Sequence, residues 1–119
     1  MSSEWAPLSY SPEGIPELDP AWVDANRSSL QILDVREPAE FDGPLGHIPG
    51  ATLIPLGQLA DRVGELPKDK PIVAVCRSGA RSAQATHILH GAGFAQVANL
   101  PGGMLRWRQE GRIIENQGT

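Results

Sequence analysis

A short apolar run, PIVAVC at residues 71–76, places the strictest limit on the architecture of this chain. The run is rich in β-branched residues and follows a proline, which is typical of a parallel strand buried on both faces. The segment ARSAQATHILHGAG at 80–93 comes next, and Gly91 and Gly93 mark its end as a helix. A buried strand that leads directly into a helix predicts a parallel sheet covered by helices.

The rest of the chain repeats this alternation of strand and helix. Asp19 followed by Pro20 has the pattern of an N-cap and first helical residue. We predict strands at 30–35, 51–55 and 95–100, a short edge strand at 14–18, and helices from Asp19 and at 37–41, 56–66 and 102–111. The pattern predicts an α/β fold with a central, mainly parallel sheet of about five short strands and helices on both faces. We assign residues 14–111 to one domain, 1–13 to a lead-in and 112–119 to a tail.

Composition narrows the classes of partner. A chain of 119 residues can form one domain with its own core. Its formal net charge of −4 argues against nucleic acid or an anionic membrane as a partner. No apolar stretch approaches the roughly 18 residues needed to span a bilayer, and the first residues lack the pattern of a signal peptide. The single cysteine fits a reducing compartment, so we expect a cytoplasmic location.

That cysteine, Cys76, ends the strongest predicted strand and begins the loop CRSGARS. Backbone N–H groups of a tight loop entering a helix form a site for an anion. With two arginines nearby, such a loop favours thiolate over thiol and makes the sulfur nucleophilic. The alternative is a cysteine that only packs in the core. We predict Cys76 as the nucleophile and the following loop residues as the binding site: Arg77, Ser78, Gly79, Ala80 and Arg81.

The number of residues between Cys76 and Arg81 separates two kinds of cysteine enzyme. A cysteine phosphatase requires five residues between its cysteine and arginine, whereas here Arg81 comes one position early and Ser82 stands in its place. The shorter loop fits a sulfur atom carried on the cysteine better than a phosphoryl group.

Three segments in this order resemble the single-domain rhodanese (sulfurtransferase) family. They are ILDVREPAEFDGPLGHIPGA at 32–51, CRSGARS at 76–82 and LPGGMLRW at 100–107. The resemblance extends from about residue 14 to residue 111. It implies that Cys76 takes a sulfane sulfur from a small-molecule donor such as thiosulfate, forms a persulfide, and passes the sulfur to cyanide or a thiol. A sulfur-accepting protein is a further candidate partner, and we expect neither cofactor nor metal.

The sequence departs from the thiosulfate-specific members of that family at two positions. Those members carry a basic residue two positions after the cysteine and a threonine at the end of the loop, where this chain has Ser78 and Arg81. The departure leaves the identity of the sulfur donor open.

Other polar residues are expected to support the loop. Asp34 ends its strand at the ligand edge of the sheet, Arg36 follows it, and His47 lies in a predicted turn. We interpret Asp34 as a structural brace, Arg36 as a member of an ion pair, and His47 as a packing or capping residue. Two alternatives remain: a non-catalytic binding or regulatory module of this fold, and a small cysteine-dependent phosphatase or arsenate reductase.

Overall fold

The computed structural model describes residues 5–116 and contains one six-stranded sheet in the order β1-β2-β6-β5-β3-β4. All neighbouring strands are parallel except β1 and β2. The strands are β1 Ser9–Tyr10, β2 Pro16–Glu17, β3 Gln31–Asp34, β4 Thr52–Leu53, β5 Ile72–Val75 and β6 Val97–Asn99. The predicted fold class, α/β with a mainly parallel sheet, is confirmed.

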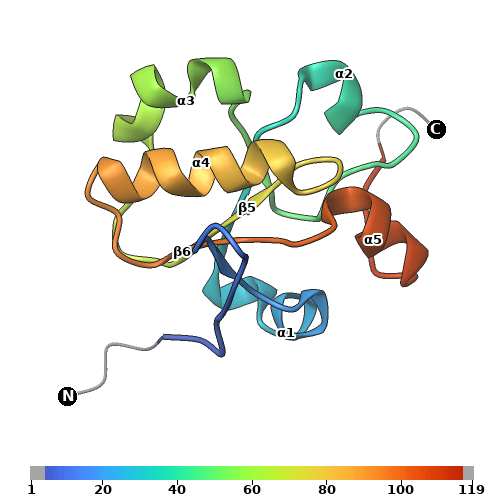
Figure 1. Cartoon of the computed structure of the whole chain (residues 1–119). Coiled ribbons are helices and arrows are strands. Elements are labelled where there is room, and N and C mark those ends of the chain that lie inside the picture. The colour runs from blue at the N-terminus through green and yellow to red at the C-terminus, as the bar shows by residue number, and fades with distance from the viewer. Residues whose placement is uncertain (1–4, 117–119) are drawn as a thin grey trace.

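Helices cover both faces of this sheet, as the sequence predicts (Figure 1). Helices α3 and α4 pack on one face, and α1 and α5 on the other. The helices are α1 Pro20–Ala25, α2 Pro38–Phe41, α3 Leu56–Arg62, α4 Ala80–Gly91 and α5 Gly103–Gln109, with 3-10 turns at Arg27–Ser29 and Val63–Glu65.

Strand β5 explains how the two faces are divided. Ile72 and Ala74 pack under α3 and α4, whereas Val73 and Val75 belong to the core beneath α1 and α5. Both sets are fully buried because alternate side chains of a strand point to opposite faces. This is why the sequence of β5 is continuously apolar rather than alternating.

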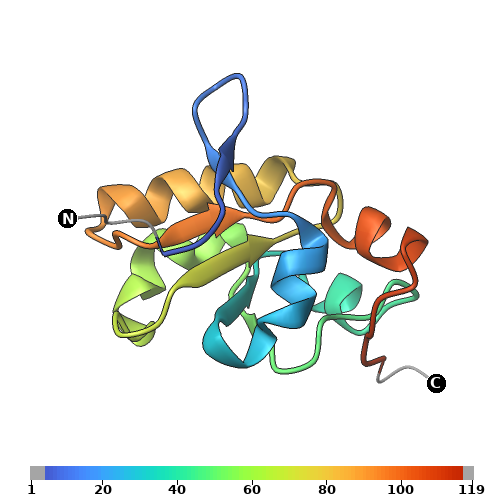
Figure 2. The same cartoon turned by 90° about the horizontal axis from the view of Figure 1, so that it is seen from below.

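The amino-terminal region differs from the prediction in one respect. Residues 14–18 were expected to form an edge strand, but β2 lies between β6 and β1. Ser9–Tyr10 therefore forms the edge, and the turn that joins it to β2 projects from the body of the molecule (Figure 2). The sheet thus begins before residue 14. Near the carboxyl end of the chain, Glu115 forms an isolated antiparallel bridge with His47.

Within the described residues, no helix is long and apolar enough to cross a membrane.

Candidate active site

Cys76 is the first residue after β5, at the carboxyl ends of the parallel strands. In parallel sheets this edge is where ligands bind. Its side chain is 1% exposed, and its Sγ atom accepts a hydrogen bond of 3.1 Å from the backbone N–H of Gly79. Gly79 has a φ of 109°, a conformation that favours glycine, and this places its N–H under the sulfur. The loop is therefore folded around the sulfur atom.

The surroundings of Cys76 act on its acidity in opposite directions. Burial alone would raise the pKa of the thiol, because it disfavours the charged form. Hydrogen bonds from the Ser82 side chain and from the backbone N–H groups of Ser82, Gly79 and Ser78 outweigh burial and lower the pKa below its ordinary value. The hydrogen-bond donors of the loop and of Ser82 therefore favour the thiolate, and neither Arg77 nor Arg81 is among the main causes of this shift.

A polar residue with no role predicted from the sequence, Asn99, completes this environment. Asn99 ends β6, the strand next to β5, and is buried. Its Nδ2 donates to the Gly79 carbonyl at 3.2 Å, and its Oδ1 accepts from Ser82 Oγ at 2.5 Å. The Ser82 Oγ atom also lies 3.3 Å from Cys76 Sγ. Its signal in the sequence is a polar residue at the ligand end of a predicted strand, the same signal that marks Asp34.

The segment LPGGMLRW holds the loop from the other side. The carbonyl groups of Cys76 and Arg77 accept the backbone N–H groups of Met104 and Leu105 at 2.9 and 3.0 Å. Gly103 has a φ of 55°, and a Cβ atom there would overlap both of these carbonyl groups. Met104 and Trp107 are fully buried, so they belong to the core beneath the loop.

The two arginines of the loop have different surroundings. The Arg81 guanidinium makes a bidentate ion pair with Glu40 of α2, at 2.8 and 2.9 Å. The hydrogen bond from Arg81 lowers the pKa of Glu40 to about 2. Arg77 is exposed, and its guanidinium has no ion pair with a residue in the described part of the chain. The charge of Arg81 is thus largely compensated, whereas that of Arg77 faces outward.

Asp34 and Arg36 form a buried ion pair behind the site. Both side chains are 1% exposed, and Arg36 Nη2 lies 2.7 Å from Asp34 Oδ2. Arg36 also donates to the carbonyl groups of Glu40 and Gly46. The Asp34 oxygens bind Arg36 rather than the Cys76 loop, so the pair braces α2 and the segment that follows it.

His47 lies outside the Cys76 loop. Its ring stacks on Phe41 with centroids 3.7 Å apart, and its Nδ1 is 2.9 Å from the Phe41 carbonyl oxygen. These contacts fasten the segment after α2 to the helix itself.

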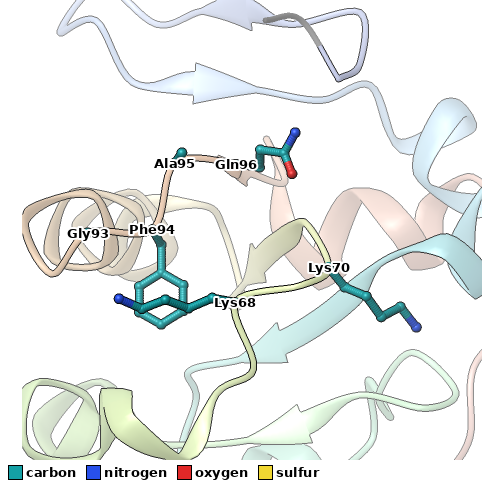
Figure 3. A pocket seen from close by; sticks show the side chains of 6 residues that line it. All are labelled: Lys68, Lys70, Gly93, Phe94, Ala95 and Gln96. Atoms are coloured by element: carbon teal, nitrogen blue, oxygen red, sulfur yellow. The ribbon is translucent and has the colours of Figure 1, made fainter.

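Two hollows differ in their relation to the sulfur. A pocket of about 270 Å³ borders the loop, lined by Arg36, Glu40, Pro44, Leu45 and Arg77. A second, of about 470 Å³, lies at the amino ends of β5 and β6 and is lined by Lys68, Lys70, Gly93, Phe94, Ala95 and Gln96 (Figure 3). Cys76 lies at the opposite end of β5, so the first pocket is the one that belongs to the site.

Metal-binding side chains do not cluster within residues 5–116. No group of three or more His, Cys, Asp or Glu side chains is placed to hold an ion in this range.

Comparisons with known proteins agree with this geometry. The family model for the rhodanese-like domain matches residues 19–110. The chain is 40% identical over 90 residues to a sulfurtransferase of Allochromatium vinosum, which covers 76% of this chain and 82% of the relative. It is 38% identical over 77 residues to the thiosulfate sulfurtransferase GlpE of Pseudomonas syringae, covering 65% of this chain and 71% of that protein.

One further relative is longer than the matched region, and solved structures show the same fold. The uncharacterized protein YqhL of Bacillus subtilis is 46% identical over 83 residues, and the match spans 70% of this chain but 64% of YqhL. Among solved structures, a rhodanese-related protein of Thermoplasma volcanium superposes with a TM-score of 0.78 at 30% identity, covering 83% of this chain and 96% of that chain. A Rhodopseudomonas palustris protein described as a possible tyrosine phosphatase has a TM-score of 0.72 at 31% identity, with 85% of each chain covered.

Proposed function

We propose that this chain, which belongs to the rhodanese-like domain family, is a sulfurtransferase that carries a sulfane sulfur as a persulfide on Cys76. The observation that supports this most is the environment of Cys76 Sγ, which accepts the Gly79 N–H and lies beside the Ser82 hydroxyl. Those hydrogen bonds lower the pKa of the thiol despite burial, and thiolate is the nucleophilic form.

In the first half-reaction the Cys76 thiolate attacks the outer sulfur of a donor such as thiosulfate. A new S–S bond forms, the bond between the outer sulfur and the sulfonate sulfur breaks, and sulfite leaves with that electron pair. The products are a persulfide anion and sulfite, so the total charge is unchanged. The N–H groups of the loop would stabilise the charge on the terminal sulfur, which is the principal catalytic device this site offers.

In the second half-reaction a thiophilic acceptor, cyanide or a thiol, attacks the terminal sulfur. The S–S bond breaks, and its electron pair returns to Cys76 Sγ as thiolate. No proton donor is required in the cyanide reaction, because thiocyanate leaves as an anion. This balance needs no cofactor.

The exposed guanidinium of Arg77 is the proposed contact for an anionic donor. It borders the pocket that also contains Pro44 and Leu45, whereas Arg81 is already paired with Glu40. The N–H groups at Ser78, Gly79 and Ala80 are proposed to bind the transferred sulfur or the donor's oxyanion. Asp34, Arg36 and His47 are proposed as supporting residues, since each fixes the segments around the loop.

The test is turnover of the wild-type protein and of Cys76→Ala with three donors: thiosulfate, mercaptopyruvate and glutathione persulfide. We expect turnover with at least one donor in the wild type and none in the variant. The absence of turnover with all three would contradict the proposal. Hydrolysis of an aryl phosphate faster than sulfur transfer would support the phosphatase alternative instead.

A further inference from the structure

The Ser82 hydroxyl has two neighbours but only one proton. Its oxygen lies 2.5 Å from Asn99 Oδ1 and 3.3 Å from Cys76 Sγ. A serine hydroxyl can donate one hydrogen bond at a time and accept others. The Asn99 oxygen and a thiolate at Cys76 are both acceptors, so they compete for the same proton.

The orientation of the Asn99 amide follows from its other partner. Its Nδ2 lies 3.2 Å from the Gly79 carbonyl oxygen, which also accepts the N–H of Ala83. A flipped amide would place two oxygen acceptors against each other, so Nδ2 faces Gly79 and Oδ1 faces Ser82. The Asn99 oxygen is therefore an acceptor for Ser82, and both side chains are buried at 3% and 0% exposure, where water does not replace a missing donor.

We propose that Asn99 is a positioning residue that holds the Ser82 proton whenever Cys76 is a thiol or a persulfide and gives it up only to the thiolate. In the thiol state, Cys76 S–H donates to Ser82 Oγ, and Ser82 donates to Asn99. In the thiolate state, the hydroxyl turns to Sγ and leaves Asn99 Oδ1 without its donor. The persulfide step in this account rests on the proposed function.

The consequence concerns the balance between free and loaded protein. In the persulfide, Sγ is bonded to the outer sulfur and carries neither a proton nor the full negative charge, so the Ser82 proton can return to Asn99. The Ser82–Asn99 bond thus favours the persulfide over the free thiolate. This would keep the sulfur on Cys76 until an acceptor arrives.

Charged groups also lie on the elements around the thiol, and the test must separate their effects from that of Asn99. Arg81 of α4 interacts with the charge of Cys76, and Asp34 and Glu40 lie near Arg81. The remaining charged groups on the surrounding elements are Arg36 and Arg77 beside the loop, Arg106 and Arg108 on α5, His87 and His90 on α4, and Asp61 and Arg62 on α3. None of them changes in the variants below, so their contributions cancel in differences between variants.

The experiment is a thiol titration by ultraviolet thiolate absorbance in wild type, Ser82→Ala, Asn99→Leu and the double variant. It is direct because Cys76 is the only thiol in the chain. Ser82→Ala removes a donor to the thiolate, so we expect the pKa to rise by about one unit. Asn99→Leu removes the competing acceptor, so we expect the pKa to fall by up to about one unit, but only where Ser82 is present.

A purely structural role of Asn99 predicts a different pattern. Loss of the Nδ2 bond would loosen Gly79 and raise the thiol pKa equally with or without Ser82. That result, or no change in either background, would overturn the proposal. Thr86→Val is the matched control, because it removes a buried hydroxyl that donates to the Ser82 carbonyl and should leave the thiol pKa unchanged.

A measurement on the wild type keeps the proposal testable if the Asn99 variants do not fold. The NMR signal of the Asn99 side-chain carbonyl carbon should change as Cys76 is deprotonated and return to its thiol-state position on loading with sulfur. A signal that stays constant through the thiol titration would overturn the proposal. The titrations use no sulfur donor, so their outcome is independent of whether the protein transfers sulfur.

Discussion

At the scale of single residues, the site depends on close approach of backbone to backbone. Gly79 brings its N–H under the sulfur, and Gly103 lets α5 meet the carbonyl groups of Cys76 and Arg77. Gly103 has a positive φ and no room for a Cβ atom, so its lack of a side chain is a steric requirement. Gly103 of LPGGMLRW is therefore part of the architecture of the loop.

Gly103→Ala should destabilise the protein by more than about 2 kcal/mol, because it combines an unfavourable φ with overlap against two carbonyl groups. Urea unfolding followed by circular dichroism would measure this. Gly57→Ala is the control, because that position in α3 has open space and should be neutral or slightly stabilising. Equal stability of Gly103→Ala and wild type would show that the loop can move aside at no cost.

Arg77→Ala tests the proposed donor contact. Loss of one exposed charge should raise the KM for thiosulfate about fivefold, with little effect on the reaction of the loaded protein with a neutral thiol. The sensitivity of the KM to added salt should also decrease, since less attraction remains to be screened. Steady-state kinetics at two ionic strengths would measure both, and an unchanged KM would remove Arg77 from the binding site.

At the scale of elements, the sequence predicts the strands and helices whose positions follow from a local pattern of residues. The apolar run gives β5, and Asp19 followed by Pro20 gives the start of α1. The predicted strand end at Cys76 is one residue too late, because β5 ends at Val75 and Cys76 follows it. The pairing of Arg81 with Glu40, 41 residues apart, depends on how α2 packs beside the loop. The meeting of Ser82 and Asn99 likewise depends on the pairing of β5 with β6, so neither contact has a local signal.

The Arg81–Glu40 pair changes the expectation for variants of Arg81. Arg81→Ala exposes an unpaired carboxylate beside the loop, which should repel an anionic donor and raise the KM for thiosulfate. If Arg81 acts by compensating Glu40, the double variant Glu40→Ala, Arg81→Ala should recover most of the loss. If Arg81 itself holds the donor, the double variant should be as impaired as Arg81→Ala alone. Kinetics of the three variants would decide between these roles.

The Arg81–Glu40 pair also makes the stability of the folded protein depend on pH. The pKa of Glu40 is about 2, compared with 4.5 as its ordinary value, so the folded protein binds this proton less readily than the unfolded chain. Its contribution to stability is complete above about pH 4.5 and is lost as the pH falls towards about 2. Glu40→Gln should therefore lower the unfolding temperature at neutral pH, and the difference from wild type should shrink with acidification. A difference that grows with acidification would contradict this assignment.

At the scale of the whole molecule, a buried ion pair joins the core to the rim of the site. Asp34 ends β3, and Arg36 links it to the carbonyl groups of α2 and Gly46. Removing one partner of a buried pair leaves an uncompensated charge, so Arg36→Ala should cost about 3–5 kcal/mol. Chemical denaturation would measure this, with Arg62→Ala as a control because its pair with Glu65 lies on the surface. A small loss for Arg36→Ala would mean that water or another group reaches Asp34.

The central claim is that Cys76 carries the transferred sulfur, and intact-mass spectrometry after incubation with a sulfur donor tests it most directly. Wild-type protein should gain the mass of one sulfur atom, and cyanide or a thiol should remove it. Cys76→Ser should gain nothing under the same conditions. Wild-type protein that gains no sulfur from thiosulfate, mercaptopyruvate or glutathione persulfide, or a Cys76→Ser variant that still gains one, would contradict the account.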